Sequence, residues 1–104
     1  MTARTKATDI TPKVRAIAMR RDNHRCIYCG TTYMLQLAHV FVNRSHSGLG
    51  VEQNLVTLCI EHHMSLDNGK IEKSKPIRDV AEFYLRHHYG EIDIESLKFR
   101  KGNI

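Results

Sequence analysis

Residues 54–69 read NLVTLCIEHHMSLDNG, a stretch in which an apolar run leads directly into a cysteine and two adjacent histidines. The run before the cysteine is rich in Leu, Val and Thr, so residues 51–58 are expected to form a strand. The run after it has the length of a short helix, and the Asn-Gly pair at its end is a typical helix stop. The stretch therefore predicts a strand followed at once by a helix, with Cys59 and His62 near the junction.

A second pair of metal-binding residue types lies upstream, in residues 21–30, RDNHRCIYCG. Cys26 and Cys29 are separated by two residues. Cys59 and His62 have the same separation, which lets a turn of chain direct both side chains at one point. Zn²⁺ prefers thiolate and imidazole ligands in fours, so the two pairs predict one closed, structural zinc site that would stabilise a small core. The alternative is a group of buried free thiols beside a chance histidine.

The segment between the two pairs is expected to form a hairpin with a wide loop. Residues 35–42, LQLAHVFV, have the branched and aromatic content of a strand. Residues 43–50, NRSHSGLG, are rich in loop formers and lead into the return strand. The hairpin would connect the first ligand pair to the second.

Helices are expected on both sides of this hairpin. The Thr-Pro pair at 11–12 is a plausible cap followed by proline at the first helical position, and it predicts a helix up to residue 21. A second helix is expected over 76–89, after a Lys-rich linker at 69–75. Residues 1–11 hold few apolar side chains and are interpreted as a flexible basic arm.

With 104 residues the chain has room for one domain, expected over 12–104. Hydrophobic residues make up 41% and charged residues 26%, which is typical of a folded globular chain. No apolar run approaches the ~20 residues of a membrane span, and the first ten residues lack the apolar block of a secretion signal, so a cytoplasmic protein is expected. The net charge of +5 favours polyanionic partners.

Four further polar residues need an explanation of their own: His39, Asn54, His63 and Asp67. His63 and Asp67 are one helical turn apart, on a different face from His62, because adjacent helical residues are turned by about 100 degrees. Nitrogen and carboxylate ligands at this spacing suit a divalent ion such as Mg²⁺, Mn²⁺ or Ni²⁺, with positions left for water and a phosphate oxygen. The alternative is an exposed pair on a solvated helix face.

Three basic side chains near the hairpin loop are also open to two interpretations. His39 interrupts an apolar run and is either a satisfied core histidine or a general base, since an imidazole with a pKa of about 6.5 can accept a proton at pH 7. Arg44 and His46, in the loop, would either contact a phosphate or belong to a solvated loop.

The pattern as a whole resembles the HNH endonucleases, a family with a ββα-metal (His-Me finger) fold. The resemblance covers about residues 12–70 and rests on RDNHRCIYCG, the LAHV strand, NLVTLC and HHMSLDNG. It implies an α+β domain with a motif core at 22–70, flanking helices and a structural Cys3His zinc site. The size and the C-terminal tail are similar to those of small members encoded by phages or mobile elements. For such a protein the partners would be DNA and phage packaging or recombination proteins, in the cytoplasm of the host cell.

The resemblance also implies a role for each motif residue. His39 would be the general base that activates water, His63 a ligand of a catalytic Mg²⁺, Mn²⁺ or other divalent ion, and Asp67 a second ligand. Asn54 would tie the wide loop to the hairpin. The implied activity is that of a DNA endonuclease, a one-metal hydrolysis of phosphodiester bonds that leaves 5′-phosphate and 3′-hydroxyl ends.

Ala38 departs from the family pattern, because many members carry Asp or His before the base as a further metal ligand. The catalytic ion would then be held by two side chains, water and substrate oxygens. This departure and the net positive charge keep open a non-catalytic zinc-knuckle DNA-binding module as an alternative. A third alternative, suggested by the tail after residue 90, is a zinc-stabilised interaction protein.

Overall fold

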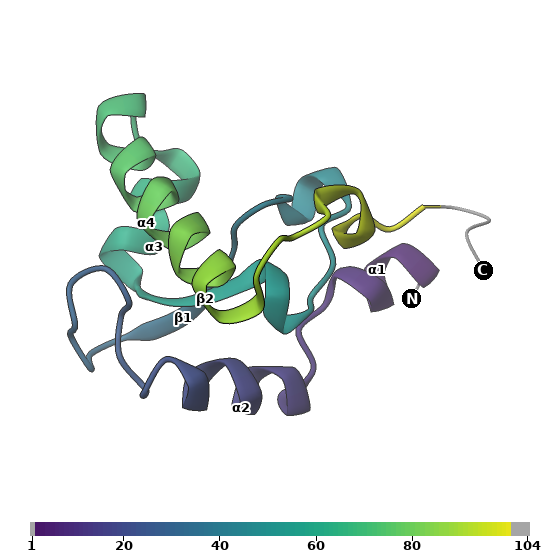
Figure 1. Cartoon of the computed structure of the whole chain (residues 1–104), viewed down its shortest axis with the longest axis horizontal. Coiled ribbons are helices and arrows are strands. Elements are labelled where there is room, and N and C mark those ends of the chain that lie inside the picture. Colours follow the sequence, from purple (N-terminus) through teal and green to yellow (C-terminus); the bar gives the residue numbers. More distant parts are fainter. Residues whose placement is uncertain (1, 101–104) are drawn as a thin grey trace.

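The computed structural model describes residues 2–100 of the chain. Helices α1 and α2 precede a two-stranded sheet, and helices α3 and α4 follow it (Figure 1). The bounds are α1 Ala3–Thr8, α2 Pro12–Arg21, β1 Leu35–His39, β2 Leu55–Cys59, α3 Ile60–Asn68 and α4 Ile71–Tyr89, with short 3-10 turns η1 Arg44–His46, η2 Glu52–Asn54 and η3 Ile94–Leu97. The chain is therefore a small α+β fold built on one hairpin, as the sequence predicts. Within residues 2–100, no helix combines the length and apolar character that crossing a membrane requires.

The two strands of the hairpin pair antiparallel, with His39 opposite Leu55. The apolar run predicts a strand up to residue 42, but β1 ends at His39. The reason is that the backbone N–H groups of Phe41 and Val42 donate to the side chain of Asn54 (2.9 and 3.1 Å) instead of a neighbouring strand. The return strand is also shorter than expected at its start, because η2 takes up the residues before it.

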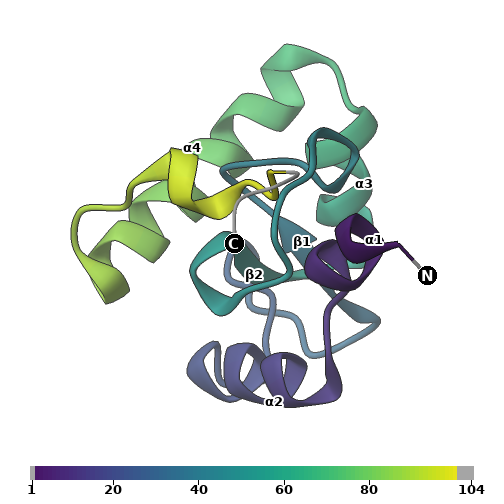
Figure 2. The ribbon, with the colours of Figure 1, turned by 90° about the vertical axis from the view of Figure 1, so that its right-hand side faces the viewer.

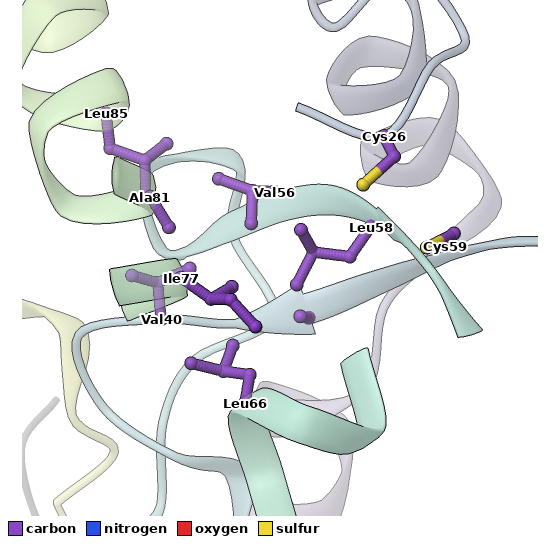
Figure 3. Packing of buried hydrophobic residues seen from close by; sticks show 10 residues of the cluster. Cys26, Val40, Val56, Leu58, Cys59, Leu66, Ile77, Ala81 and Leu85 are labelled. Carbon is purple, nitrogen blue, oxygen red and sulfur yellow. The ribbon is translucent and has the colours of Figure 1, made fainter. Parts of the chain in front are cut away.

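Helices cover both faces of the hairpin. On one face α3 and α4 pack against the sheet, and Figure 3 shows the side chains of the two helices meeting those of the strands. The buried members of this cluster are Cys26, Ala38, Val40, Val56, Leu58, Cys59, Leu66, Ile77, Ala81 and Leu85. On the other face Ala18 of α2 packs with Leu37 and Leu55. Every residue of β2 is buried, so packing holds this strand in place. The strand in turn determines the position at which α3 begins.

A buried carboxylate joins α2 to the sheet and to α4. Asp22 accepts hydrogen bonds from the guanidinium of Arg21 (2.6 and 2.9 Å), the backbone N–H of Thr57 (2.8 Å) and the hydroxyl of Tyr84 (2.6 Å). A carboxylate at a helix C-terminus is unfavourable by itself, and the ion pair with Arg21 compensates for it. The contacts hold three elements in one arrangement.

The N-terminal segment differs from the sequence-based expectation. Residues 1–11 were expected to form an arm without secondary structure, but α1 lies within this segment, and Thr2 caps it by accepting from the N–H of Thr5. The helix α2 begins at Pro12 with Thr11 as its cap, which confirms the predicted start. Residue 1 of the expected arm and residues 101–104 of the expected domain lie outside the described residues.

The expected linker at 69–75 is also wrong for most of its length, because α4 begins at Ile71. Pro76 therefore lies in the second turn of the helix, where its missing N–H removes one backbone hydrogen bond. Burial of Ile77, Ala81 and Leu85 along one face of α4 offsets this loss. Only two residues remain between α3 and α4, so the two helices pack closely beside the hairpin.

Candidate active site

The structure brings Cys26, Cys29, Cys59 and His62 together, with ligand atoms all within 4.8 Å of one another. The Sγ atoms of Cys29 and Cys59 are 3.9 Å apart, and Nδ1 of His62 lies 3.2 Å from Sγ of Cys59 and 3.9 Å from Sγ of Cys26. A tetrahedral zinc with ordinary bond lengths requires S···S and S···N separations of roughly 3.8 and 3.6 Å. Thiolate and imidazole donors at these distances fit a zinc ion.

Local backbone geometry directs the first two ligands. Gly30 closes the turn after the cysteines at φ +81°, and its N–H donates to the carbonyl of Cys26 (2.8 Å). The N–H of Ile27 donates to the carbonyl of Thr57 (3.0 Å), which ties this turn to β2. The turn therefore lies against the strand that ends in the third ligand, Cys59.

The thiols of the cluster have shifted pKa values. Burial acts to raise the pKa of Cys26, but backbone N–H donors, including that of Cys29, outweigh it and lower the value to about 6. Burial raises the pKa of the Cys59 thiol. A thiolate at Cys26 is the form that zinc binds.

A second group of polar side chains meets in an open hollow of about 230 Å³ between β1, α3 and the hairpin loop. Its lining residues are Ile10, Leu37, His39, Asn43, Arg44, His63 and Asp67. Four of the residues singled out in the sequence therefore converge, although they come from three separate segments. His46 lies exposed in η1 and is not among the lining residues.

His63 and Asp67 are arranged as two ligands of one ion would be. Nε2 of His63 lies 3.1 Å from Oδ2 of Asp67. Two neighbouring ligands of an octahedral ion with bonds of about 2.1 Å are separated by roughly 3.0 Å. The other ring nitrogen, Nδ1, lies 2.7 Å from Oε1 of Gln36. An amide oxygen only accepts, so Nδ1 carries a proton, and Nε2 is the nitrogen that would bind a metal ion together with Asp67.

His39 lines the same hollow and is held by the end of α1. Its Nε2 lies 3.2 Å from the carbonyl oxygen of Thr8, at the end of α1. Burial lowers the pKa of His39 below its ordinary value, and the nearby Arg44 and His63 act in the same direction against the Thr8 carbonyl and Asp67. The imidazole is therefore neutral at pH 7 and can accept a proton.

Asn54 connects the two ends of the loop that leads to the hollow. Its Oδ1 accepts from the N–H groups of Phe41 and Val42, and its Nδ2 donates to the carbonyls of Val42 (2.9 Å) and Leu49 (3.1 Å). The residue is fully buried. All four hydrogen-bonding positions of the amide are thus used to shape the loop, and none is directed at a substrate.

Arg44 belongs to the same loop and reaches the hollow. In the chain without substrate it forms an ion pair with Asp9, which lies between α1 and α2. More than half of the Arg44 side chain remains exposed, so the guanidinium is accessible to an anion.

Sequence reasoning missed Gln36, Thr8 and Asp9. Gln36 is a polar residue inside an apolar strand, which is a signal that could have identified it. Thr8 contributes only a backbone carbonyl, which no residue pattern reveals. Ala38 itself is fully buried in the cluster beneath α3 and α4 and does not line the hollow.

No protein-family profile and no curated protein matches the chain. Among solved structures the chain is similar to the Type IV phosphorothioation-dependent restriction endonuclease ScoMcrA, with a TM-score of 0.55 and 19% sequence identity. The match covers 83% of this chain but only 23% of that chain, so this chain spans about a quarter of the length of that enzyme. At this identity the similarity shows a shared fold, and the chain therefore has the fold of one part of a restriction endonuclease.

Proposed function

We propose that the chain is a divalent-metal-dependent DNA endonuclease with the ββα-metal fold of the HNH family. The observation that carries the proposal is the convergence of His39, His63, Asp67 and Arg44 on one hollow. The Cys3His cluster beside it fits a structural zinc, and the shared fold with part of a restriction endonuclease adds support. DNA as the substrate is also consistent with the net charge of +5.

Each residue of the hollow would have a different role in phosphodiester hydrolysis. His39, neutral at pH 7, takes a proton from the attacking water. His63 and Asp67 would hold a divalent ion such as Mg²⁺ or Mn²⁺, which when bound supplies Lewis-acid polarisation of the phosphate and stabilises the departing 3′ oxygen. Arg44 exchanges the carboxylate of Asp9 for a phosphate oxygen, because a guanidinium binds both anions with the same fork of donors.

Plasmid cleavage tests this proposal directly. Purified chain is incubated with supercoiled plasmid, with and without Mg²⁺ or Mn²⁺, and nicked and linear products are measured. We expect cleavage that depends on the added ion and is abolished by His39→Ala, while DNA binding in a gel-shift assay is retained. His24→Ala is the matched control, because His24 is exposed in the turn after α2 and lies outside the hollow.

A non-catalytic zinc-knuckle DNA-binding module is the alternative. It is favoured by Ala38, which offers no ligand atom, since among the residues described along 2–100 the hollow then leaves His63 and Asp67 as the protein ligands for a catalytic ion. The test is whether the chain binds DNA but leaves it uncut with Mg²⁺ and with Mn²⁺, at chain concentrations well above those that saturate DNA binding. That result would establish this alternative and refute the nuclease.

A further inference from the structure

Figure 2 shows helix α1 and the segment that follows it leading to α2. The side chain of Arg4 joins α1 to the hairpin loop. Its Nε donates to the hydroxyl of Ser47 (2.8 Å), and its Nη2 donates to the carbonyls of Arg44 and Ser45 (both 3.1 Å). Ser47 has a positive φ of 68°, which is unusual for a residue with a side chain, so the bond from Arg4 supports a strained point of the loop. The helix is thus attached to the loop that carries Arg44.

The end of α1 fits against Gly50 at the other end of the same loop. The N–H of Gly50 donates to the carbonyl of Ala7 (3.0 Å). A methyl group on Gly50 would lie 2.2 Å from the carbonyl oxygen of Asp9 and 2.9 Å from that of Thr8. The absence of a side chain at this position is therefore what lets the end of α1 lie where the Thr8 carbonyl contacts His39.

The Thr8 carbonyl determines where the proton of neutral His39 lies. A carbonyl oxygen only accepts hydrogen bonds, so the nitrogen 3.2 Å from it, Nε2, must be the protonated one. A neutral imidazole carries one proton, which leaves Nδ1 with a free lone pair. Among the described residues, Nδ1 of His39 has no hydrogen-bond partner.

We propose that α1 is a positioning element of the active site, whose Thr8 carbonyl holds the proton of His39 on Nε2 and so makes Nδ1 the nitrogen that takes a proton from water. This inference rests on the proposed role of His39 as the general base. It assigns a function to a segment that lies before the hairpin and its zinc ligands. Arg4 and Gly50 are positioning residues, since they act on His39 through the placement of α1.

The tautomer of His39 tests the proposal without DNA. Long-range ¹H–¹⁵N spectra of the labelled full chain, above pH 7 and without added divalent ion, distinguish Nε2–H from Nδ1–H. The parent chain should show the Nε2–H form. Gly50→Ala, which inserts a methyl group against Thr8 and Asp9, should shift the tautomer ratio toward Nδ1–H by about fivefold, the effect of losing one ordinary hydrogen bond.

Two further variants make the test independent of how well Gly50→Ala folds. Arg4→Ala removes an exposed side chain that attaches α1 to the loop, and it should shift the ratio in the same direction. Lys6→Ala is the matched control, because Lys6 is an exposed cation on the same helix, and it should leave the ratio unchanged.

The results separate this inference from the nuclease proposal. An Nδ1–H form or an even mixture in the parent chain would overturn the inference, and so would an unchanged ratio in every folded variant that disturbs α1. If His39 holds the Nε2–H form and plasmid is not cleaved, the nuclease function fails although the contact is correct. If plasmid is cleaved while the parent chain shows a mixture, the positioning role fails alone.

Discussion

Replacing Asn54 by alanine should destabilise the chain by about 4 kcal/mol. The substitution deletes four hydrogen bonds of 2.9 to 3.1 Å to backbone groups of Phe41, Val42 and Leu49. Asn54 is fully buried, so water does not readily replace the lost partners. At about 1 kcal/mol for each bond the sum is about 4 kcal/mol, a large part of the roughly 5–15 kcal/mol that holds a small domain folded.

Urea unfolding followed by circular dichroism measures this loss. The midpoint should fall in Asn54→Ala while the slope stays constant, because the surface exposed on unfolding hardly changes. Asn54→Asp is a control of matched shape that keeps the acceptor for Phe41 and Val42 but places a charged oxygen against the carbonyls of Val42 and Leu49. It should also be destabilised at pH 7, and less so at a pH low enough to protonate the carboxyl group. A loss below about 1 kcal/mol in Asn54→Ala would refute the reasoning, since the loop would then be held by other contacts.

Three further predictions concern the two metal centres. Cys59→Ser should abolish zinc binding, measured by elemental analysis, and should unfold the chain, because metal binding contributes to folding; a zinc-free parent chain that is folded would contradict this. Since burial lowers the pKa of His39, the decline of cleavage on the acid side of a pH–rate profile at saturating metal should have its midpoint below the ordinary histidine pKa of about 6.5; a decline centred above pH 7 would show a different base. Ala38→Asp should lower the melting temperature, because it buries a carboxylate in an apolar cluster. Because Ala38 does not line the hollow, the metal titration of cleavage should not move in the folded variant; a shift to lower metal concentration would show that residue 38 reaches the ion and would contradict this placement.

The spacing of residues along the chain predicted the features that depend on short-range geometry. Cys26 and Cys29 lie in one turn, and Cys59 and His62 lie at a strand–helix junction, so each pair converges through local backbone structure. The convergence of the two pairs follows from the hairpin that joins them, which the alternation of apolar and loop-forming residues also indicated.

The features that sequence reasoning missed depend on long-range polar contacts. Helix α1 carries no apolar stripe that would predict its position, and it is placed by hydrogen bonds from Arg4 to a loop some forty residues away. The start of α4 was predicted at residue 76 because proline is common in first turns, but burial of Ile77 and the residues that follow it sustains a helix that begins earlier. In both cases tertiary contacts override the local signal.

The two candidate metal centres share the first turn of α3, which links their chemistry. Cys59 is the N-cap of this helix and makes no side-chain capping bond. Zinc bound by Cys59 and His62 would therefore be what holds the turn from which the next residue, His63, faces the hollow. Removal of that zinc would let the turn fray and would separate His63 from Asp67, so a chelator would stop cleavage even where the hydrolytic ion is abundant. Inhibition by EDTA alone consequently cannot identify a hydrolytic ion; restoration of cleavage by Mg²⁺ in a chain that has kept its zinc is the observation that reports on His63 and Asp67.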